Sequence, residues 1–155
     1  MTKPEIRRAT IEDLPQIVAL LHDDVLGEKR ERSGVGPLPT GYYQAFQSIA
    51  ADANHDVVVC ADEGIVVGCM QLSFLPGLSH AGTWRAQIES LRVARSARRQ
   101  GMGESMIAFA VREAKARKCG IIQLTTDKRR LAARSFYEAL GFRATHEGLK
   151  LELGF

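Results

Sequence analysis

The chain has 155 residues, of which 45% are hydrophobic and 25% are charged, and its formal net charge at pH 7 is +3. These values are ordinary for a globular protein, and the length suffices for a hydrophobic core. So small a positive charge argues against nucleic-acid binding, and no stretch approaches the roughly 18 apolar residues that a membrane span needs. We therefore expect one domain over residues 1–155 that contacts neither nucleic acid nor membrane.

The three cysteines, Cys60, Cys69 and Cys119, lie far apart and show no Cys-x-x-Cys spacing. The N-terminal residues contain no apolar segment of the signal-peptide kind. Both features are typical of a cytoplasmic protein with reduced thiols. Because His, Cys, Asp and Glu nowhere have the spacing of metal ligands, we also expect no metal cofactor.

Hydrophobic periodicity predicts strands and helices along most of the chain. In chain order, the predicted elements are a strand at Glu5–Ala9, a helix over residues 14–25, a loop at Gly27–Gly41, a helix at Tyr42–Ala53, strands at Val57–Asp62 and Ile65–Phe74, a loop at Leu75–Thr83, a strand at Ile88–Val93, a helix at Gly103–Arg117, a strand at Ile121–Thr125, a helix at Arg129–Leu140 and a hairpin at Phe142–Leu153. Glu63-Gly64 suits a tight turn between two of the strands. This order predicts an α/β (α+β) protein with a mixed, mostly antiparallel central sheet and helices on both faces.

The loop after the predicted strand Ile88–Val93 contains several arginines and two glycines, Gly101 and Gly103, just before a predicted helix. Such a loop can direct several backbone N–H groups toward one point at the positive end of the helix dipole. We expect it to bind a phosphorylated ligand, which the arginines would strengthen. A Walker A loop is excluded because no lysine or hydroxyl residue follows Gly103, and a dinucleotide fingerprint lacks its third glycine.

Two motifs around this loop resemble the GNAT family of N-acetyltransferases. Arg98-x-x-Gly101-x-Gly103 is similar to the family's Gln/Arg-x-x-Gly-x-Gly/Ala signature, and Ile88–Val93 is similar to its fourth strand. Residues 133–142 resemble the family's last helix and the turn beyond it. The resemblance is clear over residues 86–145 and looser over residues 5–75. It implies the acyl-CoA N-acyltransferase fold, in which strands four and five diverge and the cofactor enters the gap.

The resemblance implies acetyl-coenzyme A (acetyl-CoA) as co-substrate, with its pyrophosphate held by the loop. Main-chain groups of Leu91 and Val93 would pair with the pantetheine amides like an added strand. The residues predicted to bind the cofactor are Leu91, Arg92, Val93, Arg98, Arg99, Gln100, Gly101, Met102, Gly103, Glu104, Thr126, Arg130, Ala133 and Phe136. Arg130 stands where the family often has asparagine, so its contact must differ from the usual one.

Transfer of an acetyl group from a thioester to an amine needs an acid that protonates the departing thiolate. Tyr137 stands at the position that the family motif assigns to this acid, and a tyrosine pKa of about 10 is close to that of a thiol. The alternative role for Tyr137 is a ring that packs and forms hydrogen bonds locally.

Glu89 is the best candidate for the base that deprotonates the amine. It alternates with Leu91 and Val93, so we expect it on one strand face among apolar neighbours, where its pKa would be raised. The alternative is a carboxylate at the sheet edge in an ion pair with Arg85 or Arg92.

These patterns predict an acetyl-CoA-dependent N-acetyltransferase that acetylates a primary amine by direct transfer in a ternary complex. A small-molecule acceptor is favoured because the loops at Gly27–Gly41 and Leu75–Thr83 could close a compact pocket. A protein-directed acetyltransferase and a non-catalytic acyl-CoA-binding or sensing module are the alternatives, and Tyr137 argues against the second. A homodimer is the default assembly.

Overall fold

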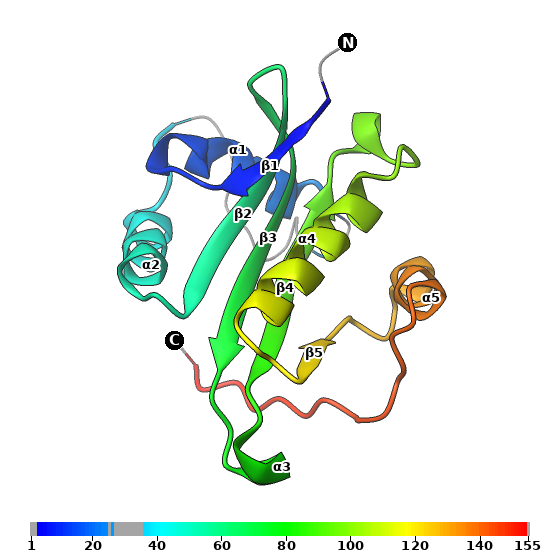
Figure 1. Ribbon diagram of the computed structural model, residues 1–155. Coiled ribbons are helices and arrows are strands. Elements are labelled where there is room, and N and C mark those ends of the chain that lie inside the picture. Colours follow the sequence, from blue (N-terminus) through cyan, green and yellow to red (C-terminus); the bar gives the residue numbers. More distant parts are fainter. Residues whose placement is uncertain (1–2, 25, 27–35, 155) are drawn as a thin grey trace.

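The computed structural model describes residues 3–24, 26 and 36–154. They form a five-stranded sheet in the order β1-β2-β3-β4-β5, covered by helices on both faces (Figure 1). The strands are β1 (Glu5–Arg8), β2 (His55–Asp62), β3 (Ile65–Leu75), β4 (Arg85–Val93) and β5 (Ile121–Leu124). The helices are α1 (Leu14–His22), α2 (Thr40–Ala51), α3 (Ser79–Gly82), α4 (Met102–Ala116) and α5 (Leu131–Ala139), with 3₁₀ turns at Ile11–Asp13 and Arg95–Ala97. Within the described ranges, no helix has the length and apolar character to cross a bilayer.

Three of the four strand pairs are antiparallel, and only β4 and β5 are parallel. This confirms the predicted mixed, mostly antiparallel sheet. The pairing of β5 with β4 runs only from Arg85 opposite Ile121 to Ile88 opposite Leu124. Beyond Ile88, β4 continues to Val93 while β5 has ended, so no described strand pairs with this side of β4 from Glu89 onward.

Each face of the sheet carries its own hydrophobic core. The α4 side buries Val58, Cys60, Met70, Leu72, Phe74, Ala86 and Ile88 of the strands together with Met102, Met106, Ile107, Ala110 and Ala114. The α1 side buries Val59, Val66 and Cys69 beneath Ile17 and Leu20. Because successive strand residues point to opposite faces, the long apolar runs of the central strands supply both cores at once. The predicted cover of helices on both faces is thereby confirmed.

The tight turn between β2 and β3 forms where the sequence predicts it. Asp62 pairs with Ile65, which leaves Glu63 and Gly64 as the two loop residues. Both have positive φ values, of 48° and 82°. Two left-handed residues match the right-handed twist of the flanking strands, which is why a glycine in this turn favours the hairpin.

The predicted hairpin at Phe142–Leu153 is wrong. Among the described residues that follow α5 there is no strand, and the chain from Arg143 to Gly154 is exposed. Alternating apolar residues make a strand only when a neighbouring strand accepts their backbone hydrogen bonds, and this segment has no such neighbour in the described structure. Residues 27–35 of the predicted loop at Gly27–Gly41 lie outside the described part of the chain. After residue 36 the chain is described again, and α2 begins at Thr40.

Gly68 in β3 lies against Met106 of α4. A Cβ atom at this position would be 2.8 Å from Met106 Sδ, 3.2 Å from Cys60 Cβ and 3.3 Å from the Arg92 carbonyl oxygen. We expect Gly68→Ala to lower the free energy of unfolding by about 1–3 kcal/mol, because the core must move to admit the methyl group. Urea denaturation measures this change.

Gly41→Ala on α2 is the matched control, since a Cβ there meets nothing within 4 Å. Alanine is favoured over glycine in helices by about 0.5–1 kcal/mol, so this variant should be as stable as the natural chain or slightly more so. Equal stability of the two variants would show that Met106 and α4 move aside without cost.

Candidate active site

An extra residue in β4 reorients the side chains at the point where β4 and β5 separate. Gln71 pairs with Glu89 and Cys69 pairs with Arg92, so two steps along β3 match three steps along β4. The irregularity is a β-bulge, and Ser90 within it has a φ of 55°. Glu89 and Arg92 therefore lie on the α1 side of the sheet, the side of Cys69, although they are three residues apart.

The bulge overturns the prediction that Glu89 shares a strand face with Leu91 and Val93. Leu91 and Val93 pack against the core on the α4 side, whereas Glu89 is on the opposite side and exposed to solvent. The strict alternation assumed from the sequence fails because the extra residue shifts the pattern by one. The expected apolar surroundings of Glu89 are thus also wrong.

Two carbonyl groups of the diverging part of β4 accept hydrogen bonds from arginines. Arg92 Nη1 donates to the Leu91 carbonyl at 2.9 Å, and Arg98 Nε donates to the Val93 carbonyl at 3.2 Å. These are main-chain groups predicted to pair with pantetheine. A ligand that pairs with β4 as an added strand would take over these acceptors, with the arginine side chains turning aside.

The basic loop ends in a backbone conformation that depends on Gly101. Arg99 and Gly101 have φ values of 60° and 77°, and α4 begins at the next residue, Met102. The first hydrogen bond into the helix runs from the Ser105 N–H to the Gly101 carbonyl at 3.0 Å. The N–H groups that precede it, at Met102, Gly103 and Glu104, lie at the positive end of a 15-residue helix and suit an anion.

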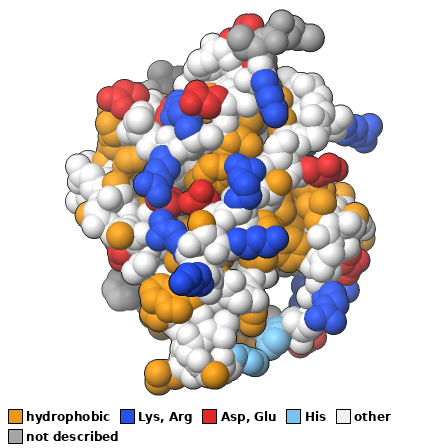
Figure 2. All heavy atoms as spheres, in the orientation of Figure 1, with side chains coloured by type: hydrophobic (Ala, Val, Ile, Leu, Met, Phe, Trp, Pro, Cys, Tyr) orange, Lys and Arg blue, Asp and Glu red, His pale blue; other side chains and the backbone are white. Residues whose placement is uncertain are grey.

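Side chains around the loop leave room for a ligand. A Cβ at Gly101 would meet nothing within 4 Å, so open space lies over the loop. Arg98, Arg99, Gln100 and Glu104 are exposed, whereas the side chains of Ala97 and Met102 are buried in the core. Figure 2 shows that the Lys and Arg side chains gathered on the face that Figure 1 presents lie over the middle of this face, around α4 and the sheet, and not at the loop. The open space over the loop nevertheless fits the pyrophosphate-binding role that the sequence predicts.

Gly103 joins the loop to α5. A Cβ at Gly103 would be 3.1 Å from Phe136 Cζ, so the absence of a side chain lets the aromatic ring lie against the start of α4. Phe136 in turn contacts Tyr137 edge to face, with the ring centroids 5.2 Å apart. The glycine thus contributes to fixing α5, and with it Tyr137, relative to the loop.

Tyr137 packs into the core between aromatic neighbours and charged ones. Its ring also meets Phe142 edge to face at a centroid distance of 5.7 Å. Burial raises the pKa of the Tyr137 hydroxyl above its ordinary value, although the positive charges of Arg92 and Arg130 act to lower it. The hydroxyl is therefore protonated at neutral pH, which is the state that a general acid needs.

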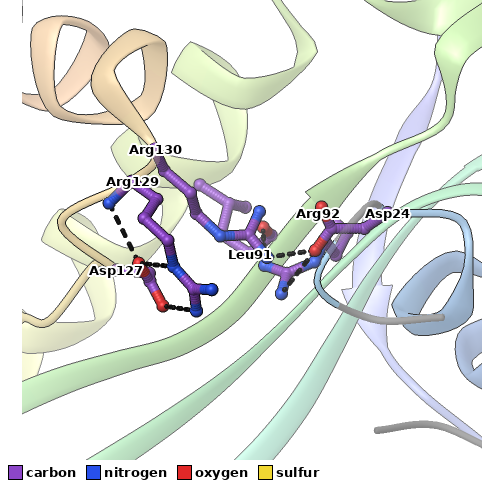
Figure 3. Close-up of polar contacts among 6 residues, drawn as sticks. All are labelled: Asp24, Leu91, Arg92, Asp127, Arg129 and Arg130. Atoms are coloured by element: carbon purple, nitrogen blue, oxygen red, sulfur yellow. Dashed lines mark hydrogen bonds and ion pairs between the residues drawn. The ribbon is translucent and has the colours of Figure 1, made fainter. Parts of the chain in front are cut away.

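Asp24, just after α1, connects two of the predicted cofactor residues across the gap between β4 and β5. Its Oδ2 lies 3.6 Å from Arg92 Nη2 and forms an ion pair with Arg130 Nη2 (Figure 3). Burial disfavours the charged carboxylate, but the hydrogen bond from Arg130 and the charges of both arginines outweigh it, so the pKa of Asp24 is below its ordinary value. Sequence reasoning missed Asp24, because it follows the amphipathic helix without any motif.

The turn before α5 is fixed by Asp127. Its carboxylate accepts hydrogen bonds from the Arg129 N–H at 2.9 Å and from the Arg129 guanidinium at 2.7 and 2.9 Å (Figure 3). These bonds hold the pKa of Asp127 well below its usual range. Among the other predicted cofactor residues, Thr126 and Ala133 are half-buried on either side of this turn.

An apolar cavity of about 130 Å³ lies between α1, α2 and the sheet. Its walls include Ile17 and Leu21 of α1 and Phe46 and Ile49 of α2. Gln71 and Ser90 also line it, so the cavity extends to the bulge. It therefore opens on the same side of β4 as Glu89 and Arg92. Within the described ranges, no group of three His, Cys, Asp or Glu residues is arranged to hold a metal ion.

The gap beside β4, the glycine-containing loop at the N-terminus of α4 and the protonated Tyr137 suit a transferase that uses an acyl-CoA. The model of the Acetyltransferase (GNAT) family matches residues 20–142, so the chain belongs to this family of N-acetyltransferases, which use acetyl-CoA as co-substrate.

Three relatives illustrate the range of this similarity. The aminoalkylphosphonate N-acetyltransferase of Salmonella typhimurium is 30% identical over 146 residues, which cover 92% of this chain and 86% of the relative. A crystal structure described as a transcriptional regulator from Bacillus halodurans is 48% identical, with a TM-score of 0.94 and coverage of 97% of this chain and 100% of that one. An acetyltransferase from Trypanosoma brucei is 25% identical, with a TM-score of 0.77 and the same coverage.

Gly101→Val should weaken acetyl-CoA binding. A β-branched residue at a φ of 77° costs roughly 1–2 kcal/mol and will pull the loop amides out of their arrangement. We expect the Kd for acetyl-CoA, measured by calorimetry, to rise at least tenfold. Gly64→Val introduces similar strain at a φ of 82° in the β2–β3 turn, far from the loop in sequence, and should leave the Kd unchanged. Equal binding by the two variants would remove Gly101 from the cofactor site.

Proposed function

We propose that the protein acetylates the primary amine of a small molecule by direct transfer from acetyl-CoA in a ternary complex. The observation that carries this proposal is the position of Tyr137. The hydroxyl is protonated at neutral pH and lies within the electrostatic reach of Arg92 and Arg130, and the neighbouring Phe136 ring lies against Gly103 of the loop.

The transfer needs one bond to form and one to break. The amine nitrogen bonds to the carbonyl carbon of the thioester, the carbon–sulfur bond breaks, and the Tyr137 hydroxyl gives its proton to the leaving sulfur. A proton lost from the amine nitrogen restores the charge balance. A well-placed acid that protonates the thiolate as it leaves increases the rate by a factor of about 10²–10⁴.

Direct transfer is supported by the state of the cysteines. Cys69 lies beside the bulge, where its thiol faces the Ser90 carbonyl at 3.8 Å, but burial raises its pKa to about 12. Burial also raises the pKa of Cys60 and Cys119. Because the thiolate is the reactive form of cysteine, none of these residues suits an acetyl-cysteine intermediate at neutral pH.

We propose Glu89 as the base that takes the amine proton. Its carboxylate is exposed at the bulge, on the face where the apolar cavity reaches Ser90 and Gln71. An exposed carboxylate can accept the proton through water, and much of the rate then depends on the neutral fraction of the amine itself.

The acceptor, in this proposal, carries an acidic group in addition to its amine. Arg92 and Arg130 bring two guanidinium groups to the gap between β4 and β5, and guanidinium groups bind phosphonate or carboxylate oxygens with two hydrogen bonds. Asp24 between them offers a carboxylate for the ammonium group. The relative from Salmonella typhimurium, named for aminoalkylphosphonates, supports this acceptor class.

Tyr137→Phe tests the catalytic assignment, because it keeps the ring and its packing and removes only the proton. We expect kcat to fall by about 10²–10⁴ while the Kd for acetyl-CoA changes less than a few fold. The release of free thiol measures kcat across a panel of amines. Tyr43→Phe on α2 is the control and should be fully active.

In the same assay, Glu89→Gln distinguishes the loss of the base from the loss of the acid. Its activity should recover in part at high pH, where the amine is neutral without help, whereas Tyr137→Phe should not recover. A rate for Tyr137→Phe equal to that of the natural chain would remove Tyr137 from the mechanism. Binding of acetyl-CoA without transfer to any amine would instead indicate a sensing protein.

Arg130→Gln tests the acceptor class. We expect it to raise the KM for an aminoalkylphosphonate at least tenfold and to change the KM for an uncharged alkyl amine less than twofold. Arg129→Gln is the matched control, since the adjacent Arg129 is paired with Asp127 in the same turn. A raised KM for acetyl-CoA, with no change for the acceptor, would place Arg130 on the cofactor as the sequence resemblance suggested.

A further inference from the structure

The cavity between α1, α2 and the sheet is lined mainly by hydrophobic side chains. Ile17 and Leu21 line it from α1, Phe46 and Ile49 from α2, and Cys69 from β3. Its volume is about 130 Å³. Protein interiors are packed as closely as organic crystals, and voids larger than a water molecule are few in one domain. A cavity of this size beside a candidate active site therefore suits a bound group.

Helix α2 lines the cavity without packing into the sheet. None of its residues is fully buried, and Tyr42, Phe46 and Ile49, which line the cavity, belong to neither hydrophobic core. Helix α1, by contrast, buries Ile17 and Leu20 in the core of this face. Apolar side chains around an unfilled cavity make the fold less stable, because they lack packing partners on one side. An apolar group in the cavity would supply those partners.

The cavity lies beside the charged groups that the proposed function assigns to the acceptor. Ser90 in the bulge lines the cavity, and so does Cys69, which pairs with Arg92 across the sheet. Leu21 lines it three residues before Asp24, whose carboxylate forms an ion pair with Arg92. An acceptor whose ammonium and acidic groups lie at these charges therefore has a hydrophobic surface directly beside it.

We propose that the acceptor carries, in addition to its amine and its acidic group, a compact branched alkyl side group that occupies this cavity. The inference rests on the proposed function and narrows its substrate class to hydrophobic aminoalkylphosphonates. A cavity of roughly 150 Å³ with Leu, Ile and Phe walls accepts benzene. The slightly smaller cavity of this protein suits an alkyl group of about four carbons.

Acceptors of increasing side-group size test this inference. Aminomethylphosphonate has no side group, 1-aminoethylphosphonate has a methyl group, and 1-amino-3-methylbutylphosphonate has an isobutyl group. Each added carbon that is buried should raise kcat/KM roughly two- to fourfold, so we expect the isobutyl compound to exceed aminomethylphosphonate by roughly tenfold or more. A naphthylmethyl side group, which is too large for the cavity, should lose this gain.

A larger side chain in the cavity wall should remove the preference. Ala45 of α2 lines the cavity, and Ala45→Phe should abolish the difference in kcat/KM between the isobutyl compound and aminomethylphosphonate. Ala50→Phe is the matched control, because Ala50 is exposed on the same helix and does not line the cavity, and it should keep the preference. Phe46→Ala enlarges the cavity and should move the optimum to the naphthylmethyl compound.

Calorimetry tests the cavity without catalysis. In the presence of coenzyme A, 3-methylbutylphosphonate, which lacks the amine, should bind the protein roughly tenfold more tightly than methylphosphonate. Ala45→Phe should remove this difference in Kd, and Ala50→Phe should retain it.

The outcomes separate this inference from the proposed function. Acetylation of aminomethylphosphonate without a preference for the isobutyl compound would overturn the inference and leave the proposed function intact. If no amine is acetylated, the proposed function fails, and equal Kd values for the two phosphonates in calorimetry would overturn the inference as well. Loss of activity with butyryl-CoA in Ala45→Phe, with the acceptor preference retained, would assign the cavity to the acyl chain of the donor and would also overturn the inference.

Discussion

The geometry of the candidate site depends on two irregularities of β4. One is the bulge at Ser90, opposite β3, and the other is the end of the pairing with β5 at Ile88. The bulge adds a residue to β4, and β5 stops pairing after Ile88, so the strand pairs with β3 on one side while its other side faces the gap. Because of this extra residue, Arg92 lies on the α1 face like Glu89, whereas Leu91 and Val93 lie on the α4 face. A regular strand would have placed the carboxylate of Glu89 and the side chains of Leu91 and Val93 on the same face.

Two opposing effects, burial and pairing with arginines, set the protonation states of the groups around the gap. Burial favours the neutral form of every acid, and at Tyr137 and Cys69 it prevails, which leaves a proton donor and an unreactive thiol. At Asp24 two guanidinium groups outweigh burial and keep the carboxylate charged. One narrow region thus holds a neutral acid, a carboxylate and two cations, a combination that suits proton transfer between a thioester and an amine.

Two glycines shape the packing between the loop before α4 and α5, the helix that carries Tyr137. Gly101 supplies a left-handed backbone at the start of α4, and Gly103 admits the ring of Phe136. Through Phe136 the position of Tyr137 is tied to the loop whose amides suit an anion. The two glycines therefore serve the backbone conformation of the loop and its packing against α5 at once.

The sequence alone determined the features that depend on neighbours along the chain. The periodicity of apolar residues gave the strands and helices, Glu63-Gly64 gave the hairpin turn, and the glycine-spaced loop with Tyr137 indicated the family and its co-substrate. The tertiary structure decided what depends on distant partners. The bulge arises from the pairing of β3 with β4, Asp24 meets Arg130 from far along the chain, and the C-terminal leucines remain unpaired because a strand needs a neighbour that no local pattern can supply.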